Sequence, residues 1–137
     1  MKLYFAPGAC SLAPHIAASE LGINLDLEQV DLREKKTKSG NDYLTINPKG
    51  QVPVLEFDNG ELLTEVPVIL QYLSDQKPAG NLTPAAGTPE RYRMLEWLNF
   101  VTSELHKTLG PMFRPTTPEE FKKLSSELAT RRFDWVD

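Results

Sequence analysis

The sequence predicts an α/β domain followed by a separate all-helical segment. Strand and helix patterns follow one another over residues 1–77 in the order βαβαββα, which is typical of a small sheet with helices on both faces. A stretch rich in proline and glycine at 78–89 has no apolar period and predicts a linker. Two amphipathic helical patterns then occupy 90–137. Because two helices bury little apolar surface between them, we expect this second domain to be partial.

The first strand and the first helix are expected within residues 2–21. The strand candidate covers 2–5 and is ended by a Pro-Gly turn. The helix candidate runs from Ser11 to Leu21 and is closed by a glycine. We expect its buried face to contain three apolar side chains, Leu12, Ile16 and Leu21.

A second strand and a charged segment are expected next. Residues 25–30 alternate apolar and polar side chains, which predicts a half-buried strand. Residues 31–41 carry mostly charged side chains and are expected to lie in solvent. A short helix is expected over 42–46, before an Asn-Pro pair.

The stretch 47–73 carries the densest set of signals. A β-hairpin is expected from an apolar run at 52–57, an Asp-Asn-Gly turn and a return strand at 61–64. Pro67 suits the first turn of a following helix, whose apolar face contains Ile69, Leu70 and Leu73. The N-terminus of that helix offers free N–H groups and a positive dipole end, which suit a ligand carboxylate. Glu65 lies there and either caps the helix or binds a ligand's amine.

Two longer helices are expected after the linker. The first begins at Thr88-Pro89-Glu90 and runs to about Leu109, where Gly110-Pro111 ends or kinks it. The second begins at a capping box, residues 117–120, with a proline just inside the start. We expect it to place four apolar side chains on one side: Phe121, Leu124, Leu128 and Trp135.

Composition argues against several classes of partner. A net charge of −4 argues against nucleic acid or an anionic membrane as the main partner. The single cysteine, Cys10, excludes an intrachain disulfide and a cysteine-rich metal site, and favours a reducing cytosol. The two histidines have no metal-ligand spacing, so no metal site is expected. No apolar run approaches the roughly 18–20 residues that span a bilayer.

Two features are candidates for chemistry. Cys10 lies between a Pro-Gly turn and a helix start, where the dipole favours a thiolate, either its own or that of a bound thiol. The alternative is a small buried hydrophobe. Asn99, Ser103 and His106 form a polar stripe at i, i+4 and i+7, which is either a solvated face or a ligand-binding face at a cleft between the domains.

These pieces together resemble the cytosolic glutathione transferases, and most closely the bacterial beta class. The resemblance is carried by KLYFAPGACSLAPH, NPKGQVPVL, LLTE, and EWLN with SELHK. It extends from Met1 to at least Arg114. It implies a thioredoxin-like, glutathione-binding domain at 1–77 and an all-helical domain at 90–137 that is truncated, because family members continue with several more helices.

The resemblance also implies the binding residues. Pro53 is expected to be cis, with the backbone of Val52 pairing with the cysteinyl part of glutathione. Glu65 and the backbone of Val66 are expected to hold the γ-glutamyl end, and Lys35 the glycine end. Cys10 is expected beside the glutathione sulfur, and the polar stripe of the second domain is expected to border the same site. The complete set of implied glutathione-binding residues is Cys10, Lys35, Val52, Pro53, Glu65, Val66, Asn99, Ser103 and His106, with Cys10 and His106 as the catalytic pair.

The function implied is conjugation of reduced glutathione to small electrophiles in detoxification, by a cytoplasmic homodimer with glutathione as co-substrate and no other cofactor. A glutathione-dependent thiol–disulfide activity through Cys10 accompanies it. Two departures bear on the mechanism. Phe5 provides no hydroxyl late in the first strand, where other classes have tyrosine, and Val66 provides no side-chain hydroxyl. The missing hydroxyl at Val66 and the missing C-terminal helices motivate an alternative, which is a truncated or non-catalytic glutathione-binding or interaction module with the same fold.

Overall fold

The computed structural model describes residues 1–136 and divides the chain into two compact units, Met1–Ala85 and Ala86–Asp137. The boundary falls inside the stretch 78–89 that the sequence predicts as a linker. In the described part of the chain, no helix combines the length and the apolar content that a membrane crossing requires.

The first unit is built on a five-stranded sheet in the order β3-β2-β1-β4-β5. Its strands are β1 (Lys2–Phe5), β2 (Asp26–Asp31), β3 (Lys36–Thr37), β4 (Val54–Glu56) and β5 (Leu62–Thr64). β1 lies in the middle, parallel to β2 and antiparallel to β4, while the two outer pairs are antiparallel. The four expected strands are confirmed, and β4 and β5 form the expected hairpin.

β3 was not predicted from the sequence. It lies in the charged segment 31–41, which we expected to be largely solvated. Thr37 is nevertheless buried and pairs with Val30 of β2. A two-residue strand is too short to show an alternating pattern, so the surrounding charges concealed it.

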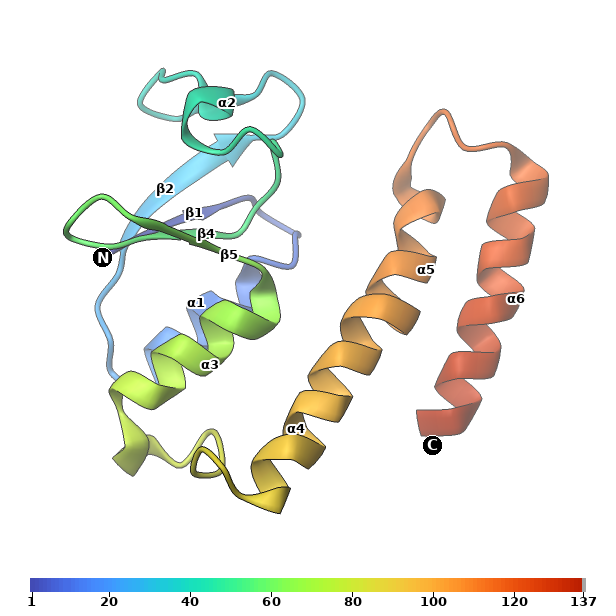
Figure 1. The fold of residues 1–137 in the computed structure, drawn as a ribbon. Helices are drawn as coiled ribbons and strands as arrows, with labels where there is room; N and C mark the ends of the chain where they lie inside the picture. Colours follow the sequence, from blue (N-terminus) through green and yellow to red (C-terminus); the bar gives the residue numbers. More distant parts are fainter. Residues whose placement is uncertain (137) are drawn as a thin grey trace. The chain divides into compact units, whose positions relative to one another are not determined.

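Three helices cover the sheet: α1 (Leu12–Glu20), α2 (Tyr43–Ile46) and α3 (Val66–Gln76), and a 3₁₀ turn, Pro78–Gly80, follows α3. α1 and α3 lie side by side on one face, and α2 lies on the other (Figure 1). Alternating side chains of the central strands supply one core to each face, as the two-residue period of a strand requires. In β4, Val54 belongs to the core with Tyr43 of α2, and Leu55 belongs to the core with Ile69 and Leu73 of α3.

The expected buried face of α1 is wrong for two of its three residues. Leu12 and Ile16 are 56% and 52% exposed. Leu21 lies about two and a half turns beyond Leu12, which places it on the opposite side of the helix axis. The face that packs toward α3 combines Leu21 with small residues, Pro14, Ala17 and Ala18.

The second unit contains two long helical arms. The first joins α4 (Pro89–Phe100), a π-helical segment (Val101–His106), α5 (Lys107–Leu109) and a 3₁₀ turn (Gly110–Phe113). The expected start is confirmed, because the Thr88 hydroxyl caps α4 by accepting from the Arg91 N–H. The change at Gly110-Pro111 is also confirmed, and the π segment is an addition to the prediction.

The second arm is α6 (Glu119–Val136), which packs against α5 and the π segment. Its buried positions are Ser125 and Ala129, whereas Phe121 and Leu124 of the expected apolar side are 50% and 47% exposed. Trp135 is the member of that side with a defined partner, since its ring lies 5.2 Å from Trp97 and 4.7 Å from Phe100 between centroids. The predicted apolar side of α6 is therefore largely exposed within the second unit, apart from the aromatic contacts of Trp135.

Candidate functional site

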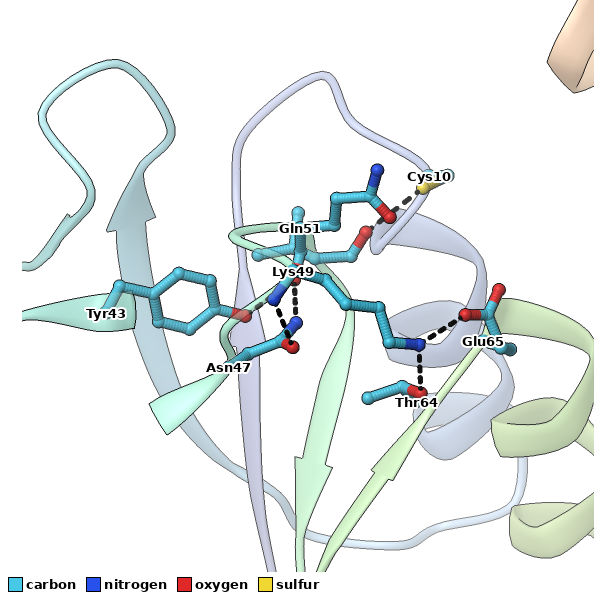
Figure 2. A network of polar contacts seen from close by, with 8 residues as sticks. Cys10, Tyr43, Asn47, Lys49, Gln51, Thr64 and Glu65 are labelled. Carbon is cyan, nitrogen blue, oxygen red and sulfur yellow. Dashed lines mark hydrogen bonds and ion pairs between the residues drawn. The ribbon is translucent and has the colours of Figure 1, made fainter. Parts of the chain in front are cut away.

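Three segments far apart in the sequence meet at one edge of the first unit's sheet. β1 ends at this edge, β4 begins there with Val54 opposite Tyr4, and β5 ends there with Thr64 opposite Val54. Consequently the loop after β1, the segment before β4 and the start of α3 lie together, and they carry Cys10, Val52-Pro53 and Glu65. Figure 2 shows Cys10 and Glu65 at this edge, with Gln51 of the segment before β4 between them.

The thiol of Cys10 contacts the backbone of the second segment. Cys10 Sγ donates to the Val52 carbonyl oxygen at 3.5 Å. The Val52–Pro53 peptide bond is cis, as the resemblance implied. Cys10 precedes α1, and Ser11 stands at its N-cap position.

The pKa of Cys10 bears on which sulfur, its own or that of a bound thiol, is the thiolate at this helix start. Burial raises the pKa of the Cys10 thiol above its ordinary value, and the negative charge of Glu65 raises it further. The backbone N–H groups of Cys10 and Ser11 act in the opposite direction but do not prevail. The resident thiol is therefore protonated at neutral pH and acts as a hydrogen-bond donor, while the same two N–H groups favour negative charge on a sulfur.

The segment before the cis bond is held by two buried side chains. The Tyr43 hydroxyl and Asn47 Nδ2 both donate to the Gln51 carbonyl oxygen, each at 2.8 Å. Burial raises the pKa of Tyr43 to about 12, so its hydroxyl keeps the proton that this hydrogen bond needs. These two positioning residues were missed, because a Tyr in a short helix and an Asn before proline are both ordinary in sequence.

Glu65 occupies the N-cap position of α3 with a φ of 75°, and its side chain makes no capping hydrogen bond. Of the two roles expected for it, the side-chain cap is wrong. The carboxylate instead accepts from Lys49, whose Nζ lies 2.8 Å from Glu65 Oε1 and 3.0 Å from Thr64 Oγ1. The Val66 N–H belongs to the first turn of α3, where an N–H group has no acceptor inside the helix. It can therefore donate to a ligand carboxylate.

Lys35 approaches the same loop from β3's side of the sheet. Its φ is 55°, and its Nζ donates to the Gly50 carbonyl oxygen at 2.8 Å. Residues other than glycine with positive φ are uncommon and are enriched at binding sites. In the described structure three such residues occur, Lys35, Glu65 and Asn81, and two of these are predicted site residues.

The remaining predicted residues belong to the second unit. Asn99 lies in α4, and Ser103 and His106 lie in the π-helical segment. All three are exposed, and Ser103 Oγ donates to the Asn99 carbonyl oxygen at 3.0 Å. The structure thus brings together the six predicted residues of the first unit, and it places the other three on one helical arm of the second. Within residues 1–136, no group of three or more His, Cys, Asp or Glu side chains is arranged to hold a metal ion.

Comparison with known proteins identifies relatives of the whole chain. Residues 8–76 match the family described as glutathione S-transferase, N-terminal domain. The glutathione S-transferase GstA of Escherichia coli O157:H7 is 46% identical over 137 residues, which cover 100% of this chain and 68% of that protein.

Solved structures agree with this comparison. The bacterial beta class glutathione S-transferase of Sphingomonas chungbukensis superposes with a TM-score of 0.96 at 48% identity, covering 99% of this chain and 68% of that one. A sphingomonad glutathione S-transferase complexed with glutathione gives the same TM-score, 0.96, and the same 48% identity, with 99% and 68% coverage. The chain therefore spans about two thirds of the length of these relatives.

Proposed function

The chain belongs to the glutathione S-transferase family, and from this premise we propose that it conjugates reduced glutathione to small electrophiles. One observation carries the proposal for this chain. A thiol, a backbone acceptor and a carboxylate follow one another along a single sheet edge, as Cys10, the Val52 carbonyl and Glu65. These groups suit, in the same order, the sulfur, the cysteinyl N–H and the ammonium of glutathione.

In the proposed complex the tripeptide lies across this edge. The cysteinyl N–H donates to the Val52 carbonyl, which Cys10 occupies in the free protein. The γ-glutamyl ammonium binds the Glu65 carboxylate, and the carboxylate beside it accepts from the Val66 N–H at the positive end of α3. Lys35, whose Nζ is held by the Gly50 carbonyl, approaches the glycine carboxylate.

The proposed reaction is a nucleophilic substitution or addition by the glutathione sulfur. The thiol releases its proton to solvent, and the thiolate forms a carbon–sulfur bond. In a substitution the leaving group departs with the electrons of its bond to carbon. In an addition the electrons of the broken π bond move to the adjacent atom, which takes a proton from solvent. The N–H groups of Cys10 and Ser11 stabilise the thiolate, and so lower the barrier through fixed dipoles.

The role proposed for Cys10 is that of a hydrogen-bond donor to the glutathione sulfur. Its raised pKa and its present bond to the Val52 carbonyl support a protonated thiol rather than a resident nucleophile. A second activity is thiol–disulfide exchange, in which Cys10 attacks glutathione disulfide, forms a mixed disulfide and releases one glutathione thiolate. The half-buried free thiol favours this activity, although its raised pKa makes attack slow.

The proposal extends to the second unit and to the partners. Asn99, Ser103 and His106 are proposed to contact the glutathione site, with His106 as the second catalytic residue. The electrophile remains a small molecule of unassigned structure. A cytoplasmic homodimer is proposed as the working form, supported by the single cysteine and by exposed aromatic side chains such as Phe113, which is 83% exposed.

Calorimetric titration with reduced glutathione tests the binding half of the proposal. A folded protein, verified by circular dichroism, is expected to bind glutathione and to conjugate it to at least one member of an electrophile panel. The mass of the protein after incubation with glutathione disulfide tests the second activity, with Cys10→Ala as the control. A folded protein that binds no glutathione would refute the proposed function for this chain.

A further inference from the structure

Lys49 is a charged residue beside the proposed site to which no role has yet been assigned. It lies in the loop between α2 and β4, and its side chain extends from that loop to the start of α3 (Figure 2). Its Nζ contacts Glu65 Oε1 at 2.8 Å and Thr64 Oγ1 at 3.0 Å. The side chains of Lys49 and Glu65 are 52% and 57% exposed, so a ligand can reach both charges.

We propose that Lys49 binds the α-carboxylate of the γ-glutamyl end, so that Lys49 and Glu65 together recognise a free α-amino acid group. This inference rests on the proposed function, because it concerns the same site. The Lys49 ammonium contacts Glu65 Oε1 at 2.8 Å, one of the two carboxylate oxygens that could accept from the ligand's ammonium. Binding then exchanges one internal ion pair for two pairs with the ligand.

The geometry of an α-amino acid favours this exchange. Its ammonium and its carboxylate are bonded to the same carbon, so a ligand whose ammonium contacts Glu65 presents its carboxylate immediately beside that contact. The Lys49 ammonium already lies there. Thr64 Oγ1 holds the same nitrogen at 3.0 Å, and therefore keeps the lysine near the ligand once Glu65 has released it.

The other donors near the start of α3 do not satisfy both oxygens of the ligand's α-carboxylate, so a cation can bind it as well. A carboxylate has two oxygens and accepts several hydrogen bonds, whereas the start of α3 contributes a single N–H at Val66, because Pro67 has none. The Val66 side chain is a hydrocarbon and donates no hydrogen bond. Lys35 is directed to the Gly50 carbonyl instead, at 2.8 Å. A charged hydrogen bond from Lys49 would complete the contacts of this carboxylate.

The test compares two ligands with three proteins and one control variant by calorimetry at low ionic strength. The ligands are glutathione and 4-aminobutanoyl-cysteinylglycine, which keeps the ammonium but lacks the α-carboxylate. The proteins are the unsubstituted chain, Lys49→Met and the charge-retaining Lys49→Arg. Lys38→Met serves as a matched control, because Lys38 is an exposed lysine of the 31–41 segment.

For Lys49→Met we expect glutathione affinity to fall about three- to fivefold, the range of a partly exposed ion pair. Lys49→Arg and Lys38→Met should bind as the unsubstituted chain does. The ligand without the α-carboxylate should bind Lys49→Met at least as tightly as the unsubstituted chain, since no lysine then competes for Glu65. Raising the salt concentration should reduce the glutathione difference.

Two results would overturn the inference. In the first, Lys49→Met loses the same affinity for both ligands, which indicates a structural role of the lysine. In the second, it binds glutathione as tightly as the unsubstituted chain or more tightly, which indicates that Lys49 only competes with the ligand. A folded, unsubstituted chain that binds neither ligand would instead refute the proposed function on which the inference rests.

Discussion

Replacing Glu65 by glutamine separates a binding role of this carboxylate from a structural one. The substitution preserves the size and shape of the side chain and removes its negative charge. Glu65 makes no side-chain cap, and the Val68 and Ile69 N–H groups donate to its backbone carbonyl, at 3.1 and 3.0 Å. The start of α3 should therefore survive Glu65→Gln.

The expected magnitudes differ between folding and binding. The Lys49–Glu65 pair is 52% and 57% exposed, so its loss should reduce the free energy of unfolding by at most about 1 kcal/mol. For a domain of this size, that corresponds to a decrease in melting temperature of up to about 8 °C. The proposed bond from the ligand's ammonium is charge-assisted and contributes about 1.5–3 kcal/mol, so glutathione affinity should fall about 10- to 150-fold.

The assay is calorimetric titration with glutathione and with N-acetylglutathione, which lacks the charged amine, alongside thermal unfolding. Glu65→Gln should weaken glutathione strongly and leave N-acetylglutathione unaffected. Glu34→Gln, at an exposed position of the charged segment, is the matched control and should change neither. Equal losses for both ligands, or unchanged glutathione binding, would refute the assignment of Glu65 to the amine.

Three further predictions concern the Cys10 thiol, the contact between Gly50 and Lys35, and the core of the first unit. Because the pKa of Cys10 is raised, its alkylation by iodoacetamide should reach half-maximal rate at a higher pH than that of a free cysteine. For the same reason, the contribution of Cys10 to the free energy of unfolding is complete below the unfolded pKa of about 8.5 and is lost as pH rises above it. Chemical denaturation at pH 7 and pH 10 measures this loss. Gly50→Ala should destabilise the first unit by about 1–2 kcal/mol in urea unfolding, because Gly50 has a φ of 61°. It should also weaken glutathione binding, because the added Cβ would lie 3.2 Å from Lys35 Nζ. Unchanged unfolding and affinity would contradict this. Leu55→Ala should cost about 3–5 kcal/mol in the same unfolding experiment, because Leu55 is 0% exposed at the centre of the sheet, whereas a loss below about 1 kcal/mol would show that the core there is loosely packed.

The fold was largely predictable because its signals are local. The Asp-Asn-Gly turn and Pro67 specify a hairpin and a helix start within a few residues, and both are found where expected. Packing partners were less predictable, since periodicity identifies an apolar face without saying what lies against it. α1 shows this clearly: its larger side chains, Leu12 and Ile16, are exposed, while Ala17 and Ala18 are buried toward α3.

The residues of the candidate site were proposed from the sequence, whereas the contacts among them were not. Cys10 and Glu65 were identified from their positions at helix starts, but the sequence left open whether the helix start favours a thiolate of Cys10 or of a bound thiol, and burial raises the pKa of Cys10 itself. Lys49 was missed altogether. Its partner Glu65 is distant in sequence, and their contact exists only after β4 and β5 have paired.

The middle position of β1 has a consequence for the order in which the chain acquires its structure. The first strand to be synthesised pairs on one side with β2 and on the other with β4, whose last residue is Glu56. Until that residue has left the ribosome, β1 has one open edge, and Cys10 has no Val52 carbonyl beside it. At about 5–20 residues per second, the chain between the end of β2 at Asp31 and the end of β4 at Glu56 takes roughly one to five seconds to synthesise. Pairing of β4 then closes the open side of β1 and completes the sheet edge around Cys10 in the same step.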